Sequence, residues 1–266
     1  MSRISKTFDK CKQENRNALV VYLTMGCPDL KESETLATKL IDAGADIVEL
    51  GVPFSDPMAD GVVIQESARL ALEAGTTLKE VLELAKNIRK NSQTPMILFS
   101  YYNVILSYGL EKLATDAKAA GIDGMLVVDL PFEHKNELEP ILNEHDLCLI
   151  PLIAPTTPLE RAFEIVSEAE GFVYSISSKG ATGGGTDFDT ELEERMGKIR
   201  KISPVPVVIG FGIDSATTAK SLTKFADGIV VGSAIMKKIN ECKNIEQGIS
   251  EAAKLTSEIA KVLKED

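Results

Sequence analysis

Two carboxylates lie close together in the segment DIVELGVPFSDPMADGVVIQ, which spans residues 46–65. Its first half has the composition of a buried strand, in which side chains alternate between two faces. If Val48 and Leu50 pack outward onto helices, Glu49 must point into the middle of a sheet or barrel. A carboxylate there is unfavourable unless it is paired, hydrogen-bonded or protonated. The alternative is a glutamate that is solvated at a strand end, and the strand alone favours neither interpretation.

The second carboxylate, Asp60, lies in the acidic loop that follows this strand. Paired carboxylates can divide acid and base roles if their surroundings push their pKa values apart. Glu49, flanked by apolar residues, is the candidate for proton transfer, whereas Asp60, in a wetter loop, is expected to stay ionised. A pair of this kind fits a lyase or isomerase acting on a small molecule.

The elements that must position these groups follow a regular alternation of buried strands and amphipathic helices. A lead-in helix is predicted over 2–13, and a long helix over 245–264 closes the chain. A helix over 133–145 should bend or restart at Pro140, and Asp214 is the candidate N-cap of a helix over 214–225. Strands are predicted at 18–24, 46–52, 95–101, 123–129, 147–153, 172–177, 204–212 and 226–234.

Eight strand-then-helix units in one chain imply parallel strands joined by right-handed crossovers. They predict a single (β/α)8 TIM barrel with an N-terminal lead-in helix, forming one domain over 1–266. An open doubly wound sheet is the alternative, but the first loop, GCPD, lacks the G-x-G-x-x-G fingerprint of that fold. The active site of such a barrel lies where the strands end, which predicts a site near Glu49, Asp60, Tyr101, Asn103, Asp129 and Tyr174.

Three glycine-containing loops follow the last strands: GATGGG at 180–185, GFG at 210–212 and VGSA at 231–234. Glycine lets the backbone approach an anion, and the N–H groups at a helix start bind phosphate without side-chain charge. The glycines could instead only relieve tight turns. Because a phosphate site near strands seven and eight recurs in this fold, the pair of loops there favours phosphate. GATGGG is also long enough to act as a lid.

The composition of the chain argues against several classes of function. The net charge of −11 argues against a nucleic-acid or anionic-membrane binder. No apolar run reaches membrane-spanning length and the N-terminus lacks a secretion signal, so a cytoplasmic location is expected. The four cysteines are far apart and the two histidines lack ligand-like spacing, so no metal site is predicted.

The segment ELGVPFSDPMADGVVIQ at 49–65 closely resembles the signature of the tryptophan synthase α subunit family. Further similar segments are YLTMGCPD, LFSYYN, DLP, GATG, GFG and GSAI, so the resemblance covers nearly the whole chain. It implies a retro-aldol cleavage of indole-3-glycerol phosphate to indole and D-glyceraldehyde 3-phosphate. It also implies no cofactor in this chain, and a β subunit that uses pyridoxal phosphate to make L-tryptophan in an αββα complex.

The resemblance assigns a role to individual residues. Glu49 would protonate indole C3 and take the proton of the glycerol hydroxyl, and Asp60 would bind the indole N–H. Thr182 would position Asp60 when the lid closes. The phosphate would bind at Gly183, Gly212, Gly232 and Ser233. The indole pocket would comprise Tyr22, Phe99, Tyr101, Leu126, Tyr174 and Phe211. The partner would be met by the loop with Pro53, Asp56 and Pro57, and by the segment 101–104.

The chain also departs from the family pattern. Val62 and Val104 stand where proline is common, Cys27 replaces a common aspartate and Met58 a common leucine. The glycines after Thr182 lack an arginine often found beyond the lid motif. Two alternatives remain beside the α subunit: a free-standing lyase that releases indole, and a weakly active allosteric partner of the β subunit. Intact Glu49 and Asp60 argue against the second.

Overall fold

The computed structural model of the chain describes residues 1–176, 186–210 and 212–264, with side chains omitted at 186–190. Its strands form one parallel sheet in the order β5-β4-β3-β2-β1-β9-β8-β7-β6. The strands are β1 (Ala18–Thr24), β2 (Ile47–Gly51), β3 (Met96–Ser100), β4 (Gly124–Val127), β5 (Cys148–Leu149), β6 (Leu152–Ile153), β7 (Val173–Ile176), β8 (Val207–Gly210) and β9 (Gly228–Val231).

The predicted barrel is confirmed, with one difference at the fifth strand. The segment predicted as one strand over 147–153 is divided into β5 and β6 on either side of Ile150 and Pro151. β5 pairs with β4, whereas β6 pairs with β7, so the two edges of the sheet are joined by the chain itself. Pro151 has no N–H to donate to a neighbouring strand, which explains the break. The Ile150 amide still bonds Met125 O at 2.7 Å, and Pro151 O accepts from Tyr174 N at 2.9 Å.

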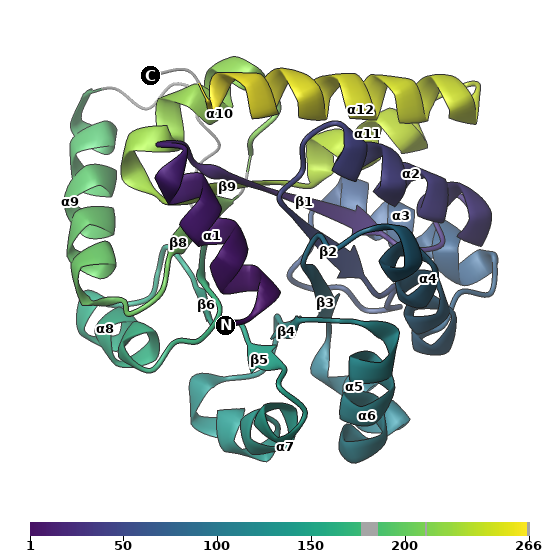
Figure 1. Cartoon of the computed structure of the whole chain (residues 1–266), viewed down its shortest axis with the longest axis horizontal. Helices are drawn as coiled ribbons and strands as arrows, with labels where there is room; N and C mark the ends of the chain where they lie inside the picture. The colour runs from purple at the N-terminus through teal and green to yellow at the C-terminus, as the bar shows by residue number, and fades with distance from the viewer. Residues whose placement is uncertain (177–185, 211, 265–266) are drawn as a thin grey trace.

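Helices surround the ring of strands (Figure 1). They are α1 (Arg3–Gln13), α2 (Leu30–Asp42), α3 (Val62–Glu73), α4 (Leu78–Asn91), α5 (Tyr102–Tyr108), α6 (Leu110–Ala120), α7 (Glu139–Glu144), α8 (Leu159–Ser167), α9 (Thr186–Ile202), α10 (Ala216–Leu222), α11 (Ser233–Asn240) and α12 (Ile245–Val262), with short 3-10 helices η1 (Phe132–Glu137) and η2 (Thr223–Phe225).

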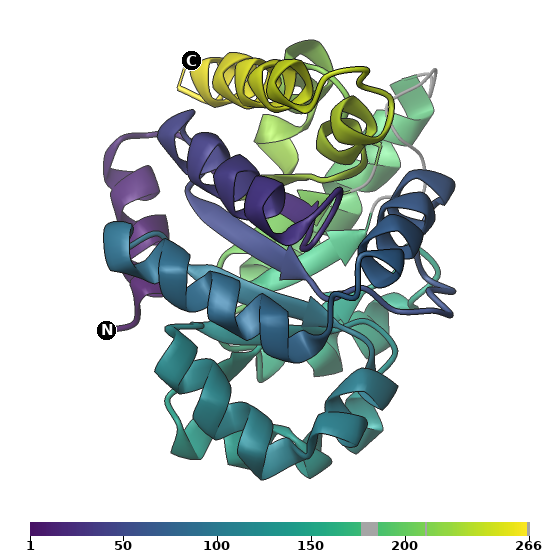
Figure 2. The same ribbon diagram turned by 90° about the vertical axis from the view of Figure 1, so that its right-hand side faces the viewer.

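Apolar residues form two separate layers. The outer layer lies between the strands and the helices, and the inner one fills the barrel, with Ala18, Val20, Ile47, Ile97, Leu126, Ile150, Phe172, Val208 and Val230. Helix α1 belongs to the inner layer, because its Ile4, Phe8 and Cys11 pack into the barrel, where the Phe8 and Phe172 rings lie 5.8 Å apart. Figure 2 shows α1 at one end of the strands, whose arrowheads point away from it. α1 therefore closes the N-terminal end of the barrel.

The helices differ from the sequence-based predictions in two places and agree with them in a third. α5 was not predicted, because no helix was assigned directly after the predicted strand over 95–101. The N-cap of α10 is Ser215, whose side chain accepts from Thr218 N, so the prediction of Asp214 was wrong. The predicted restart near Pro140 is confirmed, since η1 ends at Glu137 and α7 begins at Glu139.

Candidate functional site

Glu49 lies inside the barrel, on the opposite face of β2 from its neighbours. Val48 and Leu50 pack in the outer layer, and Glu49 is 0% exposed. Within the part of the chain that the structure describes, neither oxygen of its carboxyl group has a hydrogen-bond partner. Burial raises the pKa of Glu49 from 4.5 to about 8, because the apolar surroundings disfavour the charged form. A solvated strand-end glutamate is thereby excluded.

Asp60 lies in the loop after β2 and is held by a neighbouring strand end. Tyr101 Oη donates to Asp60 Oδ2 at 3.0 Å, and the Ala59 amide donates to the same Tyr101 hydroxyl at 3.1 Å. Burial raises the pKa of Asp60 to about 6, and the bond from Tyr101 opposes this shift. Asp60 is therefore mainly ionised at pH 7, whereas Glu49 is mainly protonated. The two carboxyl groups differ in the way that divided acid and base roles require.

A cavity of about 350 Å³ opens at the ends of the strands. The Tyr22 and Phe99 rings meet edge to face inside it, with centroids 5.0 Å apart. Burial raises the pKa of Tyr174, another lining residue, and the negative charge of Glu49 adds to this shift. The lining residues are Tyr22, Ala59, Asp60, Gly61, Val63, Ile64, Phe99, Val128, Leu152, Tyr174, Ile176, Gly212, Ile213, Asp214, Val230, Gly232, Ser233, Ala234 and Lys237.

Two glycines make room for the tyrosines of this cavity. A Cβ atom on Gly51 would lie 2.3 Å from Tyr22 Oη, and one on Gly210 would lie 2.5 Å from Tyr174 Oη. Both distances are far below van der Waals contact, so any larger residue would displace the rings. The small size of Gly51 and Gly210 thus sets the shape of the aromatic wall.

The loop between β8 and α10 and the start of α11 also line this cavity. Gly212 has a φ of +73°, a conformation that favours glycine. Gly232 is the N-cap of α11 and Ser233 is its first residue. The first N–H groups of a helix have no acceptor within the helix and attract anions. These three residues, predicted as phosphate-binding, follow the neighbouring strands β8 and β9 and line the same cavity.

Sequence reasoning missed Lys237, the only lysine or arginine among the described residues that line this cavity. Lys237 lies four residues after Ser233 on α11, so both occupy one helix face, and side chains tilt toward the helix N-terminus. The four-residue spacing between Ser233 and Lys237 could have identified this lysine from the sequence. The sequence also predicted Tyr101 as a pocket residue, whereas the structure places its hydroxyl on Asp60.

The remaining predicted residues are scattered. Leu126 is fully buried in the barrel interior and does not reach the cavity surface. Asn103 lines a separate shallow hollow with Phe54 and Val104. Asp129 accepts a hydrogen bond from the Tyr102 amide at 2.7 Å. Thr182, Gly183 and Phe211 lie outside the described residues.

The segment predicted to face a partner lies at the rim of the cavity. Pro53 is buried and Asp56 is exposed, while Pro57 is half-buried. Two of the departures from the family pattern are exposed apolar side chains of this rim, since Met58 is 94% and Val62 is 79% exposed. Exposed apolar residues of this kind are typical of an interaction surface.

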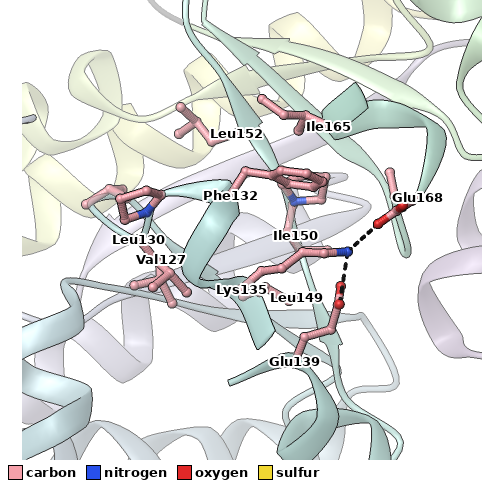
Figure 3. Close-up of a pocket in the computed structure, with 14 residues that line it drawn as sticks. Val127, Leu130, Phe132, Lys135, Glu139, Leu149, Ile150, Leu152, Ile165 and Glu168 are labelled. Atoms are coloured by element: carbon pink, nitrogen blue, oxygen red, sulfur yellow. Dashed lines mark hydrogen bonds and ion pairs between the residues drawn. The ribbon is translucent and has the colours of Figure 1, made fainter. Parts of the chain in front are cut away.

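A second cavity lies beside the first and shares Val128 and Leu152 with it. Figure 3 shows the Lys135 ammonium group between the carboxylates of Glu139 and Glu168 at one edge of this cavity. Across the described residues, no group of three or more histidine, cysteine, aspartate or glutamate side chains could hold a metal ion. Nor does any helix in the described ranges have the length and apolarity needed to cross a bilayer.

Comparison with known proteins gives one consistent result. The family model described as "Tryptophan synthase alpha chain" matches residues 8–264. A tryptophan synthase alpha chain of Geobacter sulfurreducens is 46% identical over 248 residues, which covers 93% of this chain and 94% of that one. One from Thermoanaerobacter sp. is 38% identical over 263 residues, covering 99% and 100%.

Solved structures agree with this result. Tryptophan synthase subunit alpha from Legionella pneumophila superposes with a TM-score of 0.90 at 34% identity, covering 99% of this chain and 98% of that one. A chain of Mycobacterium tuberculosis tryptophan synthase superposes with a TM-score of 0.89 at 33% identity, covering 100% and 99%.

Proposed function

The chain belongs to the tryptophan synthase alpha chain family, and on that premise we propose that Glu49 and Asp60 carry out its reaction. As a family member it is a lyase of tryptophan biosynthesis, which cleaves indole-3-glycerol phosphate to indole and D-glyceraldehyde 3-phosphate. The observation that carries the residue assignment is the buried carboxyl group of Glu49 inside the barrel, which has no hydrogen-bond partner among the described residues and lies in register with Tyr22, a residue that lines the same cavity as Asp60.

The reaction begins with protonation of the indole ring. Glu49, protonated because burial raises its pKa to about 8, donates its proton to indole C3. Positive charge develops on the ring, and the ionised Asp60 carboxylate accepts a hydrogen bond from the indole N–H and stabilises that charge. Tyr101 holds Asp60 in place for this contact. The ring thus becomes an electron acceptor for the bond that must break.

The carbon–carbon bond breaks in the second half of the reaction. The Glu49 carboxylate takes the proton of the glycerol hydroxyl next to the ring, and that oxygen forms the aldehyde carbonyl. The electrons of the broken bond return to the ring, which yields indole, and Glu49 regains the proton that it donated. No proton or electron is left over, so the cycle needs no cofactor in this chain.

The phosphate group occupies the opposite end of the cavity. The backbone of Gly212, Gly232 and Ser233, with the first turn of α11, holds its oxygens, and Lys237 adds the positive charge that this acidic chain otherwise lacks there. Gly183 completes the phosphate site in this proposal, and Thr182 positions Asp60. Tyr22, Phe99 and Tyr174 then contact the indole ring.

Membership of the family implies a β subunit as partner. We propose that the pyridoxal phosphate of the pathway is held by that subunit in an αββα complex in the cytoplasm. The rim with Met58 and Val62, together with Pro53, Asp56, Pro57 and residues 101–104, would meet it. Turnover measured with and without a β subunit separates this from a free-standing lyase, because only the α subunit should be stimulated.

The test of the residue assignment is Glu49→Gln. Glutamine has almost the same shape but no proton to donate, so we expect kcat to fall by at least 10²–10⁴-fold, the typical contribution of acid–base catalysis. Binding of a non-cleavable indole-alkyl phosphate, measured by calorimetry, should be retained. The control is Glu83→Gln on the outside of α4, which should leave kcat unchanged. Wild-type turnover in Glu49→Gln would contradict the mechanism.

A further inference from the structure

The second cavity opens where the fifth strand leaves β4. Its volume is about 160 Å³. It shares Val128 and Leu152 with the substrate cavity, so the two have a common wall. We call it the side chamber. Its lining residues are Val127, Val128, Leu130, Pro131, Phe132, Lys135, Glu139, Leu149, Ile150, Pro151, Leu152, Ile165, Glu168 and Ala169.

Side chains from both faces of the sheet line this chamber. Val127 and Leu149 belong to the outer layer, whereas Ile150 and Leu152 belong to the barrel interior. Successive side chains of a strand face opposite sides, so one cavity can reach both sets only where neighbouring strands separate. The last backbone hydrogen bond between β4 and the fifth strand is the one from Ile150 N to Met125 O, and from Pro151 onward the chain pairs with β7. The side chamber therefore lies where β4 and the fifth strand diverge.

The lining is apolar apart from one compact group of charges at its edge. Lys135 Nζ lies 3.1 Å from Glu139 Oε2 and 2.7 Å from Glu168 Oε2, and it stands over the Phe132 ring at 4.9 Å (Figure 3). These ion pairs satisfy the charges among themselves, with one carboxylate in excess. A phosphorylated ligand would be repelled by that excess, whereas a neutral apolar ligand would not.

The size of the chamber limits the ligand to a small one. A cavity of about 150 Å³ lined by leucine, isoleucine and phenylalanine binds benzene in another protein. The side chamber has a similar volume and a similar lining. Its open edge next to Glu139 and Glu168 leaves room for a slightly larger ring whose N–H can be accepted by a carboxylate.

We propose that the side chamber binds free indole, the apolar product of the cleavage, after the carbon–carbon bond has broken. This inference rests on the proposed function for the identity of the product. In this proposal the planar ring passes between Val128 and Leu152, the residues common to both cavities, while the phosphorylated product stays at α11. The chamber thus separates the two products by polarity and lowers the chance of the reverse condensation.

The experiment counts indole bound outside the substrate cavity. The wild-type chain is saturated with a non-cleavable indole-alkyl phosphate, and deuterated indole is then measured by equilibrium dialysis with mass spectrometry. We expect one equivalent of indole to remain bound. Ala169→Leu fills the chamber and should weaken that binding at least tenfold, and Leu130→Lys, at its edge, should do so without overfilling the core. Ala74→Leu, on the exposed end of α3, is the matched control.

The outcomes separate the two proposals. Indole bound to the saturated wild type and lost in both chamber variants supports the side chamber. If the phosphate analogue binds but no indole does, the side chamber is overturned and the proposed function stands. If indole binds equally to Ala169→Leu, Leu130→Lys and Ala74→Leu, it binds elsewhere and the inference is wrong. If the analogue itself does not bind the wild type, the proposed function fails.

Discussion

The two carboxyl groups predict a bell-shaped dependence of kcat/KM on pH. The active form has Asp60 ionised and Glu49 protonated, and burial raises their pKa values to about 6 and about 8. Activity should fall below about pH 6, where Asp60 takes up a proton, and above about pH 8, where Glu49 has lost the proton that it donates. Steady-state rates of the wild type and Asp60→Asn check this, because the variant should lose the acidic limb. An acidic limb kept in Asp60→Asn would assign it to another group.

The Tyr101 hydroxyl group influences the pH at which the acidic limb of this profile lies. Tyr101→Phe removes the hydrogen bond to Asp60 Oδ2, which is worth about 1 kcal/mol, so kcat/KM at pH 7 should fall roughly fivefold. Since the bond lowers the pKa of Asp60, the acidic limb should also move to higher pH. Tyr102→Phe is the control, because the Tyr102 hydroxyl bonds Glu137 on the surface at 2.9 Å. An unmoved limb in Tyr101→Phe would show that Tyr101 does not position Asp60.

At the scale of elements, helix α11 should act mainly in substrate binding. Lys237→Gln removes the lysine that lines the substrate cavity, and an exposed charge pair contributes up to about 1 kcal/mol, so KM should rise roughly fivefold with kcat retained. The neighbouring Lys238, which lies 3.6 Å from Glu251, provides the control variant Lys238→Gln. Both are measured at low and at moderate salt, since only Lys237 should affect the salt dependence of KM. Equal effects of the two substitutions would argue against a local role.

The sequence predicted elements better than the contacts between them. The apolar period revealed the strands and most helices, because it depends only on which residues are buried. It missed α5, whose aromatic and β-branched residues are also typical of a strand. It also missed the division of the fifth strand, because the pairing partners of a strand depend on the whole ring. Glu49 was correctly expected to face inward. The bond between Tyr101 and Asp60 joins residues 41 positions apart, and no local pattern signals it.

Burial of the catalytic acid, Glu49, lowers the free energy of unfolding of the whole molecule at neutral pH. Folding raises the pKa of Glu49 from 4.5 to about 8, so the folded state keeps a proton that the unfolded state releases. The free energy of unfolding should therefore decrease as pH rises through this interval, by on the order of 3 kcal/mol at pH 7. Asp60 acts in the same direction between 3.8 and about 6.

Urea unfolding at several pH values checks this linkage. Glu49→Gln has no charge to bury, so its unfolding free energy should depend less on pH above pH 6 than that of the wild type. Glu83→Gln, on the exposed side of α4, should follow the wild type. Parallel pH dependences for Glu49→Gln and the wild type would mean that Glu49 is ionised in the folded protein.

The division of the fifth strand also determines where the barrel wall is most flexible. Everywhere else along the described ring, neighbouring strands are held by ladders of backbone hydrogen bonds. Here the fifth strand bonds β4 only as far as the Ile150 amide, which donates to Met125 O, and it bonds β7 only from Pro151 O onward, which accepts from Tyr174 N. Among the described residues no backbone hydrogen bond joins β4 to the fifth strand beyond Ile150, so thermal fluctuations of the wall should concentrate at this point. Pro151, which interrupts the strand, thus gives the otherwise rigid barrel wall one flexible point.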